Sequence, residues 1–495
     1  MVYSQTNVEW NGRSKTRRPC LSERYRVHLN AARSYVVDLE PDGDNSRPPR
    51  LAATINADGG RILAMCRGRL TVDEIVKKLG YSCGSEEGSR IQAFLEGAAV
   101  AGHITWEGGA VFRPERQLTG SLEKYIPAHA SIEVTNRCNM RCKYCYHGNL
   151  GEKVQPDEEL QLEELISVLD DWQALGLLGV ELTGGEPTIS PKFIPLLRYS
   201  LNHFSLVAIL TNGTNITDDF LALIGDTKCK VLVAFSLDAP EPKLFSQVTG
   251  TTARIFERVV DGIQRVNDLG VQTNVAMTVT HRNVDQVEAV ADFLRELGVT
   301  GFSPALAAPL GNGFEDRWKW NMFLNKRFYE QFARVNRTYP GFVTNVRQVS
   351  DGKPRVPGMP EDRCDIGKRA AIMAPDGRVR ACLMMPESWN VGSVQEHRIG
   401  DIILGDSFQY FATIPFPPVA ACNGCVYELF CRDCAMTPFS VARKEGRLCG
   451  WWDDSGLAAW LRTHAQADEV NSWESAARFT TKTPIRECSQ CPRFE

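Results

Sequence analysis

The chain has 495 residues, enough for about two to four domains with a buried core. Hydrophobic residues make up 43% of it, charged residues 23%, and the formal net charge is -4, values typical of a globular protein. This charge disfavours a dedicated nucleic-acid binder, which usually carries a strong basic field. No run of about 18 apolar residues occurs, so we expect no membrane span, and the N-terminus lacks the apolar segment of a secretory signal.

Sixteen cysteines are the unusual feature of the composition. Without a secretory signal we expect a cytoplasmic protein, and in that reducing compartment cysteines more often bind metals or catalyse than form disulfides. Twelve of them are clustered, within 138–145, 364–382, 422–449 and 488–491. The other four are scattered and are expected to be ordinary core or surface residues: Cys20, Cys66, Cys83 and Cys229.

The first 112 residues predict an arm followed by a small domain. Residues 1–24 are polar and basic without hydrophobic periodicity, so we expect a flexible arm. Residues 25–112 predict a winged-helix-like domain, with strands near 25–30, 34–40 and 50–56 and a helix near 60–67. Thr71-Val-Asp-Glu74 is a capping box that starts a further helix. Residues 102–106 and 110–112, separated by Glu-Gly-Gly, predict a closing hairpin.

Residues 113–128 predict a linker, and 129–345 form the next domain. In it, short β-rich runs alternate with amphipathic helical segments, which predicts a parallel sheet with helices packed outside. The candidate strands are Ser131–Thr135, Val180–Leu182, Leu206–Leu210, Val231–Ser236, Gln272–Thr278 and Gly301–Pro304. Six strands predict an α/β fold with a partial (β/α)6 barrel, whose ligands bind at the carboxyl ends of the strands.

The C-terminal part is rich in cysteine and poor in periodicity. Residues 346–360 are Pro/Gly-rich and predict a linker. Residues 361–495 hold nine of the sixteen cysteines with little long apolar periodicity. We therefore expect a Cys-rich, cluster-binding domain whose fold depends on bound metal.

Cys138, Cys142 and Cys145 follow the first predicted strand of the barrel. Three thiolates on a short loop can hold three irons of a [4Fe–4S] cluster and leave the fourth iron open to another ligand. The alternative is a zinc site, which would need a fourth ligand, and His147 is available two residues further on.

The CxxxCxxC spacing, with Tyr144 before the last cysteine, resembles the signature of the radical S-adenosylmethionine (SAM) superfamily. Gly184-Gly185-Glu186-Pro187 resembles the family's GGEP motif, and polar residues also follow the third and fourth strands. The resemblance implies that the cluster binds SAM and reduces it to a 5′-deoxyadenosyl radical. It implies cofactor contacts at Tyr144, Gly184, Gly185, Glu186, Asn212, Ser236 and Asp238. One departure is visible, because Val248 or Thr249 stands where relatives often carry an arginine.

The cysteines after residue 361 resemble the SPASM extension, which binds two auxiliary iron–sulfur clusters. The resemblance implies an outer cluster on Cys422, Cys425, Cys431 and Cys449. It implies an inner cluster on Cys364, Cys382 and Cys434, with Cys488 or Cys491 as candidates for a fourth ligand. Two residues separate Cys431 from Cys434, where the family usually has three, and a zinc ribbon is the alternative for the paired CxxC motifs.

Residues 25–112 resemble the precursor-recognition domain related to the pyrroloquinoline-quinone peptide chaperone. Such domains bind a leader peptide as an added strand on an exposed sheet edge. A DNA-binding winged helix is the alternative, although acidic residues on the predicted helices disfavour phosphate contact. A purely structural role is a further alternative.

Together the three parts imply a radical SAM maturase of a ribosomally made precursor peptide. Its product would be a thioether, C–C or C–O cross-link, and its partners the peptide leader and an electron donor such as flavodoxin or ferredoxin. Alternatives are protein side-chain or cofactor maturation of the sulfatase-activating type, peptide epimerisation, and a non-enzymatic leader-binding or zinc-binding scaffold. The sequence names no catalytic residue beyond the cofactor contacts.

Overall fold

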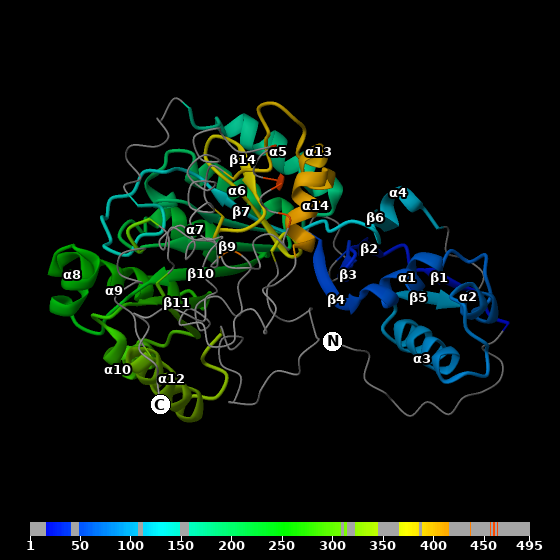
Figure 1. Cartoon of the computed structure of the whole chain (residues 1–495), viewed down its shortest axis with the longest axis horizontal. Helices are drawn as coiled ribbons and strands as arrows, with labels where there is room; N and C mark the ends of the chain where they lie inside the picture. Colours follow the sequence, from blue (N-terminus) through cyan, green and yellow to red (C-terminus); the bar gives the residue numbers. More distant parts are fainter. Residues whose placement is uncertain are drawn as a thin grey trace, which may run out of the picture.

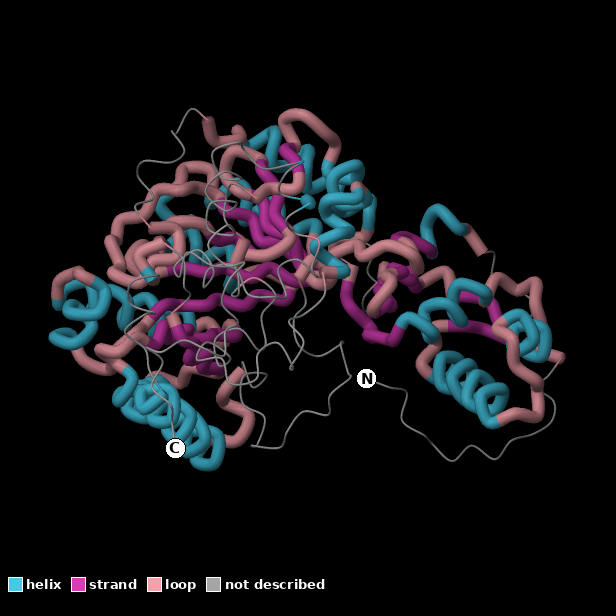
Figure 2. Tube along the Cα trace, viewed as in Figure 1, coloured by secondary structure: helices cyan, strands magenta, loops and turns pink. Residues whose placement is uncertain are grey.

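A computed structural model describes most of the chain up to residue 414 (Figure 1). The described residues are 16–40, 49–106, 112–148, 158–307, 311–313, 322–344, 366–385, 389–414 and the single positions 436, 456, 459, 460 and 463. They form a small N-terminal domain beside a larger α/β body, and Figure 2 shows helices packed around the strands in both.

The N-terminal domain is built on a four-stranded sheet of order β4-β3-β2-β6. Its strands are β2 (Tyr25–Leu29), β3 (Arg33–Asp38), β4 (Arg50–Asn56) and β6 (Leu118–Gly120). The helices α1 (Ala57–Met65), α2 (Val72–Lys78) and α3 (Glu86–Val100) follow β4. The predicted capping box is confirmed, because Thr71 and Glu74 bond reciprocally at the start of α2.

Two boundaries in this region were wrong. The predicted flexible arm contains β1 (Pro19–Leu21), which pairs antiparallel with β5 (Ile104–Trp106), the first strand of the predicted closing hairpin. Residues 107–111 of that hairpin lie outside the described residues. The predicted linker contains α4 (Pro114–Gln117) and β6, and β6 pairs parallel with β2. The paired strands are separated by about ninety residues of chain, and local periodicity does not report which distant strand is the partner, which explains these errors.

The six predicted barrel strands are confirmed as neighbouring parallel strands of one nine-stranded sheet. They are β7 (His129–Glu133), β8 (Gly179–Thr183), β9 (Leu206–Thr211), β10 (Lys230–Ser236), β11 (Gln272–Val279) and β12 (Gly301–Leu306). The connecting helices are α5 (Leu162–Leu175), η3 (Pro187–Ile189), α6 (Phe193–His203), α7 (Asp218–Gly225), α8 (Pro242–Thr249), α9 (Ala253–Asn267), η4 (Val284–Gln286), α10 (Val287–Glu296) and, after β12, α12 (Met322–Thr338).

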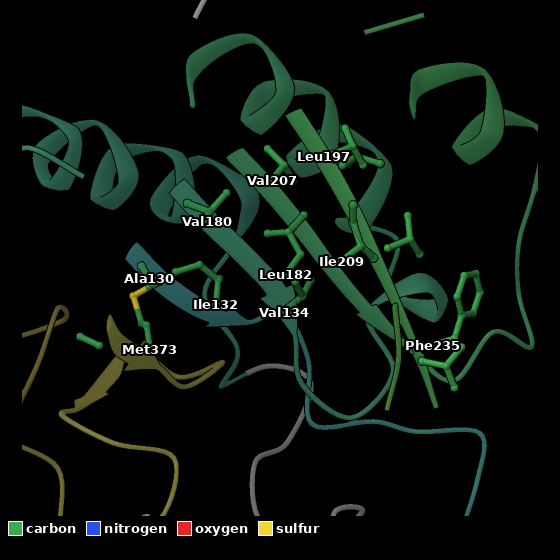
Figure 3. Close-up of a cluster of buried hydrophobic side chains, with 14 of the residues drawn as sticks. Ala130, Ile132, Val134, Val180, Leu182, Leu197, Val207, Ile209, Phe235 and Met373 are labelled. Carbon is green, nitrogen blue, oxygen red and sulfur yellow. The ribbon is translucent and has the colours of Figure 1, made fainter. Parts of the chain in front are cut away.

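The two faces of this sheet differ in chemistry. Alternate residues such as Ile132, Leu182 and Ile209 are buried in a core that includes Leu197 of α6 (Figure 3). The register places Ser131 beside Glu181 on the opposite face, and Asn274 and Ser303 lie on neighbouring strands. Small and polar side chains therefore line the inner face of the partial barrel, while aliphatic ones hold its helices.

The sheet continues into the Cys-rich region. β13 (Ala370–Met373) pairs parallel with β7, and β14 (Arg378–Arg380) and β15 (Gly392–Ser393) extend it antiparallel. Two helices follow, α13 (Ile399–Leu404) and α14 (Asp406–Thr413). Trp389, Phe408 and Phe411 are buried in the same core as the barrel. This region was expected to have little long apolar periodicity, and its described elements are short, but they contribute to the buried core; the predicted linker 346–360 lies outside the described residues.

The N-terminal domain packs against the amino ends of the barrel strands. Tyr35 and Val37 of β3 contact Ala128 and Leu178, which directly precede β7 and β8. His28 of β2 is fully buried, and its Nε2 lies 3.3 Å from the carbonyl oxygen of Ile126. This contact is on the edge of the sheet opposite to the edge where ligands are expected.

Candidate functional site

Cys138, Cys142 and Cys145 lie on the loop that leaves the carboxyl end of β7. All three thiols are half-buried and unoxidised. Burial raises the pKa of each thiol, and nearby acidic groups raise the pKa of two of them further: Glu186 and Cys145 that of Cys138, and Asp238 with the other two thiols that of Cys142. Bound metal would reverse this effect, since thiolate is the ligating form.

His147, the fourth ligand of the zinc alternative, is buried with Nε2 3.5 Å from Oε1 of Glu133. Three thiols on one short loop are the ligand pattern of a [4Fe–4S] cluster that keeps one iron open.

Gly184 and Gly185 let the loop after β8 pack directly on the backbone that leads into the cysteine loop. The nitrogens of Gly185 and Glu186 donate to the carbonyl oxygens of Thr135 and Arg137 at 2.8 and 2.9 Å. Gly184 has φ +129°, and a Cβ on Gly185 would lie 2.3 Å from the oxygen of Arg137. Both positions therefore need glycine for a geometric reason.

Glu186 ties the ends of β8 and β9 together. Its Oε1 accepts from Thr188 (N at 3.1 Å and Oγ1 at 2.5 Å) and from Oγ1 of Thr211 at 2.7 Å, while its Oε2 accepts from N of Asn212 at 2.6 Å. Burial raises the pKa of this fully buried carboxyl group, and these hydrogen bonds oppose the rise. Because Oε1 already accepts three hydrogen bonds, the amine of a ligand would have to donate a hydrogen bond to Oε2 or to the loop backbone.

Asn212 reaches across to the cysteine loop. Its Nδ2 donates to Oδ1 of Asn139 at 2.8 Å and lies 3.8 Å from Sγ of Cys138. The end of β9 thereby contacts the first cysteine, as expected if both serve one cofactor.

Asp238, after β10, is buried and accepts from the Tyr144 hydroxyl and from N of Thr278 at 2.7 Å. Burial raises its pKa to about 6, although both hydrogen bonds oppose the rise. Burial and the Asp238 charge raise the pKa of Tyr144 well above its ordinary value. Asp238 thus fixes Tyr144 within the cysteine loop, while Ser236 remains exposed at the strand end.

The sequence-predicted SAM contacts are therefore brought together at one edge of the sheet. Val248 and Thr249, at the position of the family's arginine, are buried in α8, and Arg254 is exposed in the first turn of α9. No structural account of a replacement for that arginine follows from these positions.

Of the ten predicted cluster ligands, the C-terminal set is mostly outside the described residues. Those outside are Cys364, Cys422, Cys425, Cys431, Cys434 and Cys449, as are the candidates Cys488 and Cys491. Cys382 follows β14, is half-buried, and its Sγ accepts from N of Met384 at 3.3 Å. This cysteine belongs to the same sheet as the first cysteine loop.

The sequence reasoning missed a buried ionic cluster between the two cysteine-bearing segments. Glu133 of β7 and Arg380 of β14 are 1% and 3% exposed, and Nη2 of Arg380 donates to Oε1 of Glu133 at 2.8 Å. Glu181 of β8 accepts from Oγ of Ser131 at 2.7 Å. Charged residues inside predicted strands were a signal for such a cluster. Their partners could not be predicted, because the paired residues are far apart in the chain.

Comparison with known proteins agrees with this geometry. A family model of the radical SAM superfamily matches residues 132–294, and a model of an iron–sulfur cluster-binding domain, SPASM, matches residues 364–426. The antilisterial bacteriocin subtilosin biosynthesis protein AlbA of Bacillus subtilis is 28% identical over 281 residues, which cover 56% of this chain and 59% of AlbA. The sporulation killing factor maturation protein SkfB of the same organism is 26% identical over 329 residues, which cover 66% of this chain and 75% of SkfB.

A solved structure shares the fold. SuiB of Streptococcus suis bound to S-adenosylmethionine superposes with a TM-score of 0.58 at 14% identity, over 86% of this chain and 96% of SuiB. SuiB bound to the precursor peptide SuiA gives a TM-score of 0.57 at 13% identity, over 86% and 97% of the two chains.

Proposed function

We propose that the chain is a radical SAM enzyme of the SPASM subfamily and that it matures a ribosomally made peptide by installing an oxidative cross-link. Support comes from relatives named for the biosynthesis of subtilosin and for the maturation of the sporulation killing factor, and from a similar fold that binds a precursor peptide. The chain spans 59% of the length of AlbA, so its own substrate is part of the proposal.

The radical SAM domain binds a [4Fe–4S] cluster with SAM, and the SPASM domain binds auxiliary iron–sulfur clusters. When bound, the SAM cluster would supply the one electron that cleaves SAM, the adenosyl group formed would take a hydrogen atom from the substrate, and an auxiliary cluster would accept the electron that the substrate loses with a proton on cross-linking. We propose that Cys138, Cys142 and Cys145 hold the SAM cluster. For the auxiliary clusters we propose Cys364, Cys382 and Cys434 as inner ligands and Cys422, Cys425, Cys431 and Cys449 as outer ligands.

The chain's own residues orient these groups and the peptide. The Tyr144 side chain is fixed by Asp238, and the backbone of Asn212 is fixed by Glu186, so two residues of the proposed SAM site are held by buried carboxyl groups. We propose that the small and polar inner face, including Ser131 and Asn274, is the part of the barrel that faces the peptide segment.

The observation that carries the peptide proposal is the position of β4 at the edge of its sheet, where no other described strand pairs with it. This strand pairs with β3 on one side, and its first three residues are exposed, with Leu51 41% exposed. The register skips Ala52, which marks a bulge, so this residue has no Cα partner in β3. An extended leader peptide can pair with such an edge through its backbone.

The placement of β4 constrains the peptide. The N-terminal domain packs at the amino ends of the strands, while the cysteine loop leaves their carboxyl ends. An extended peptide rises about 3.3 Å per residue, so it needs on the order of six residues to pass a five-residue strand. We therefore expect modified residues to be separated from the leader by at least such a spacer.

The leader site is tested with Ala52→Pro, which removes a backbone N–H at the edge while the bulge tolerates proline. Binding of the short precursor peptide encoded beside the gene should weaken at least tenfold, measured by fluorescence anisotropy. Ala52→Val, which keeps the N–H, should bind as the unchanged protein does. Unaltered binding to the proline variant would exclude this edge.

The reaction is tested anaerobically with SAM, a reductant and that peptide, followed by mass spectrometry. Loss of two hydrogen atoms from the peptide is the expected result for a cross-link. Unchanged mass with uptake of solvent deuterium would indicate epimerisation instead, and an unmodified peptide would contradict the proposal for that partner.

A further inference from the structure

The cysteine loop carries a surface that the proposed peptide chemistry does not use. Residues 137–148 contain Arg137, Arg141 and Lys143 and no acidic residue, within a chain whose net charge is -4. All three basic side chains are exposed, while the three thiols between them are half-buried. We call these three residues the basic rim.

The position of the basic rim is fixed by hydrogen bonds. Nη1 of Arg141 donates to the carbonyl oxygens of Cys138 and Met140 at 2.7 and 3.0 Å, which holds the guanidinium over the loop. Nζ of Lys143 donates to the carbonyl oxygen of Gln247 at 2.9 Å, so the rim continues to α8 (Figure 1). A Cβ on Gly250 would lie 3.3 Å from the oxygen of Arg141, which shows how closely the end of α8 approaches.

The positive charge of the rim is uncompensated within the described chain. The rim residues form no ion pair there. The two carboxyl groups nearest the site, Asp238 and Glu186, are buried and accept hydrogen bonds from interior donors. Because the negative charge of these two carboxyl groups lies in the interior, the described outer surface over the thiols stays basic.

From these observations we infer that the basic rim is the docking surface for a small acidic one-electron carrier protein. The carrier loses one electron and the SAM cluster gains one, with no transfer of atoms or protons. Electron tunnelling falls steeply with distance, so a carrier has to dock close to the thiols, and these exposed cations surround them. Opposite charge on the two partners steers such an encounter and fixes its orientation.

The first test measures binding of an oxidised flavodoxin to the reconstituted protein by isothermal titration calorimetry. Arg137→Glu/Lys143→Glu should weaken binding at least tenfold at low ionic strength, and the difference should shrink in about 0.5 M salt, where charges are screened. Lys77→Glu/Lys78→Glu makes the same change in net charge at exposed positions of α2 and should bind as the unchanged protein does. Equal binding of both double variants would overturn the inference.

The second test measures the reduced-cluster signal by electron paramagnetic resonance. With reduced flavodoxin, reduction of the rim variant should slow at least tenfold, while photoreduced 5-deazariboflavin, a small neutral reductant, should reduce both variants equally. Arg137→Gln/Lys143→Gln, which is milder for the loop, should give an intermediate loss with flavodoxin alone. The inference would be overturned if reduction of the cluster were slowed equally with both reductants in both rim variants. It would also be overturned if the rim variants bound flavodoxin normally but no longer bound the precursor peptide.

Discussion

At the scale of single residues, the site depends on glycines that allow two backbone segments to touch. Gly185 is packed against the carbonyl of Arg137 so closely that a methyl group would overlap backbone atoms, which cannot rotate away. The Gly-Gly pair is thus required by the approach of the β8 loop to the cysteine loop, as well as by the SAM contact that the motif implies.

Gly185→Ala tests this requirement. It should lower the free energy of unfolding by about 1–3 kcal/mol through overpacking and weaken SAM binding, because the cysteine loop has to move. Urea unfolding and calorimetric SAM titration measure the two effects. Gly84→Ala is the matched control, since nothing lies within 4 Å of its Cβ position, and it should change neither. An alanine variant of Gly185 with unchanged SAM affinity would contradict the packing argument.

At the scale of elements, a buried ion pair joins β7, which leads into the cysteine loop, to β14, which precedes Cys382. Glu133 on β7 and Arg380 on β14 form a buried pair between strands that are not neighbours, since β13 lies between them in the sheet. His147, beyond the cysteine loop, also faces Glu133. The pair therefore connects the segment with the three thiols proposed for the SAM cluster to the segment with Cys382, a proposed auxiliary ligand.

Removing one charge of this pair should cost more than removing both. Glu133→Leu leaves Arg380 buried without its partner and should lower the free energy of unfolding by about 3–5 kcal/mol. Glu133→Leu/Arg380→Met removes both charges and should recover at least about 2 kcal/mol of that loss. Urea denaturation of the two variants measures the difference, and a double variant less stable than Glu133→Leu would contradict this reading of the pair.

At the scale of the whole molecule, the N-terminal domain and the barrel meet through buried groups at the amino ends of the strands. His28 is fully buried there, and burial lowers its pKa to about 4, with the charge of Arg26 lowering it further while its hydrogen bond to Ile126 opposes this. A Cβ on Gly176 would lie 2.0 Å from Nδ1 of His28, so the contact is tight. None of the described helices is long and apolar enough to cross a bilayer.

Lowering the pH should lower the free energy of unfolding, because His28 is buried in its neutral form. The folded protein binds fewer protons than the unfolded chain between pH 4 and 6.5, so stability falls as the pH drops through this window and levels off below it. The loss from this one group is on the order of 3 kcal/mol, from ~1.4 kcal/mol per pH unit. His28→Gln should flatten the dependence in urea unfolding between pH 7 and 4. An identical slope in that variant would exclude His28 as the cause.

The amino-acid sequence by itself determined the barrel and predicted the candidate cofactor contacts. Short β-rich runs alternating with amphipathic segments predicted all six parallel strands to within a few residues, because each run is buried on one face by its own helices. The cysteine spacing and the polar residues after successive strands predicted the site, because carboxyl ends of parallel strands share one edge. Eight of the sixteen cysteines lie outside the described residues, so their assigned clusters stay predictions.

Tertiary structure alone decided which distant segments join. Five contacts link residues that share no local pattern: the pairing of β13 with β7, of β1 with β5 and of β6 with β2, the Glu133–Arg380 pair, and the contact of His147 with Glu133. The physical reason is that periodicity reports which face of an element is buried, while the partner that buries it depends on the packing of the whole chain.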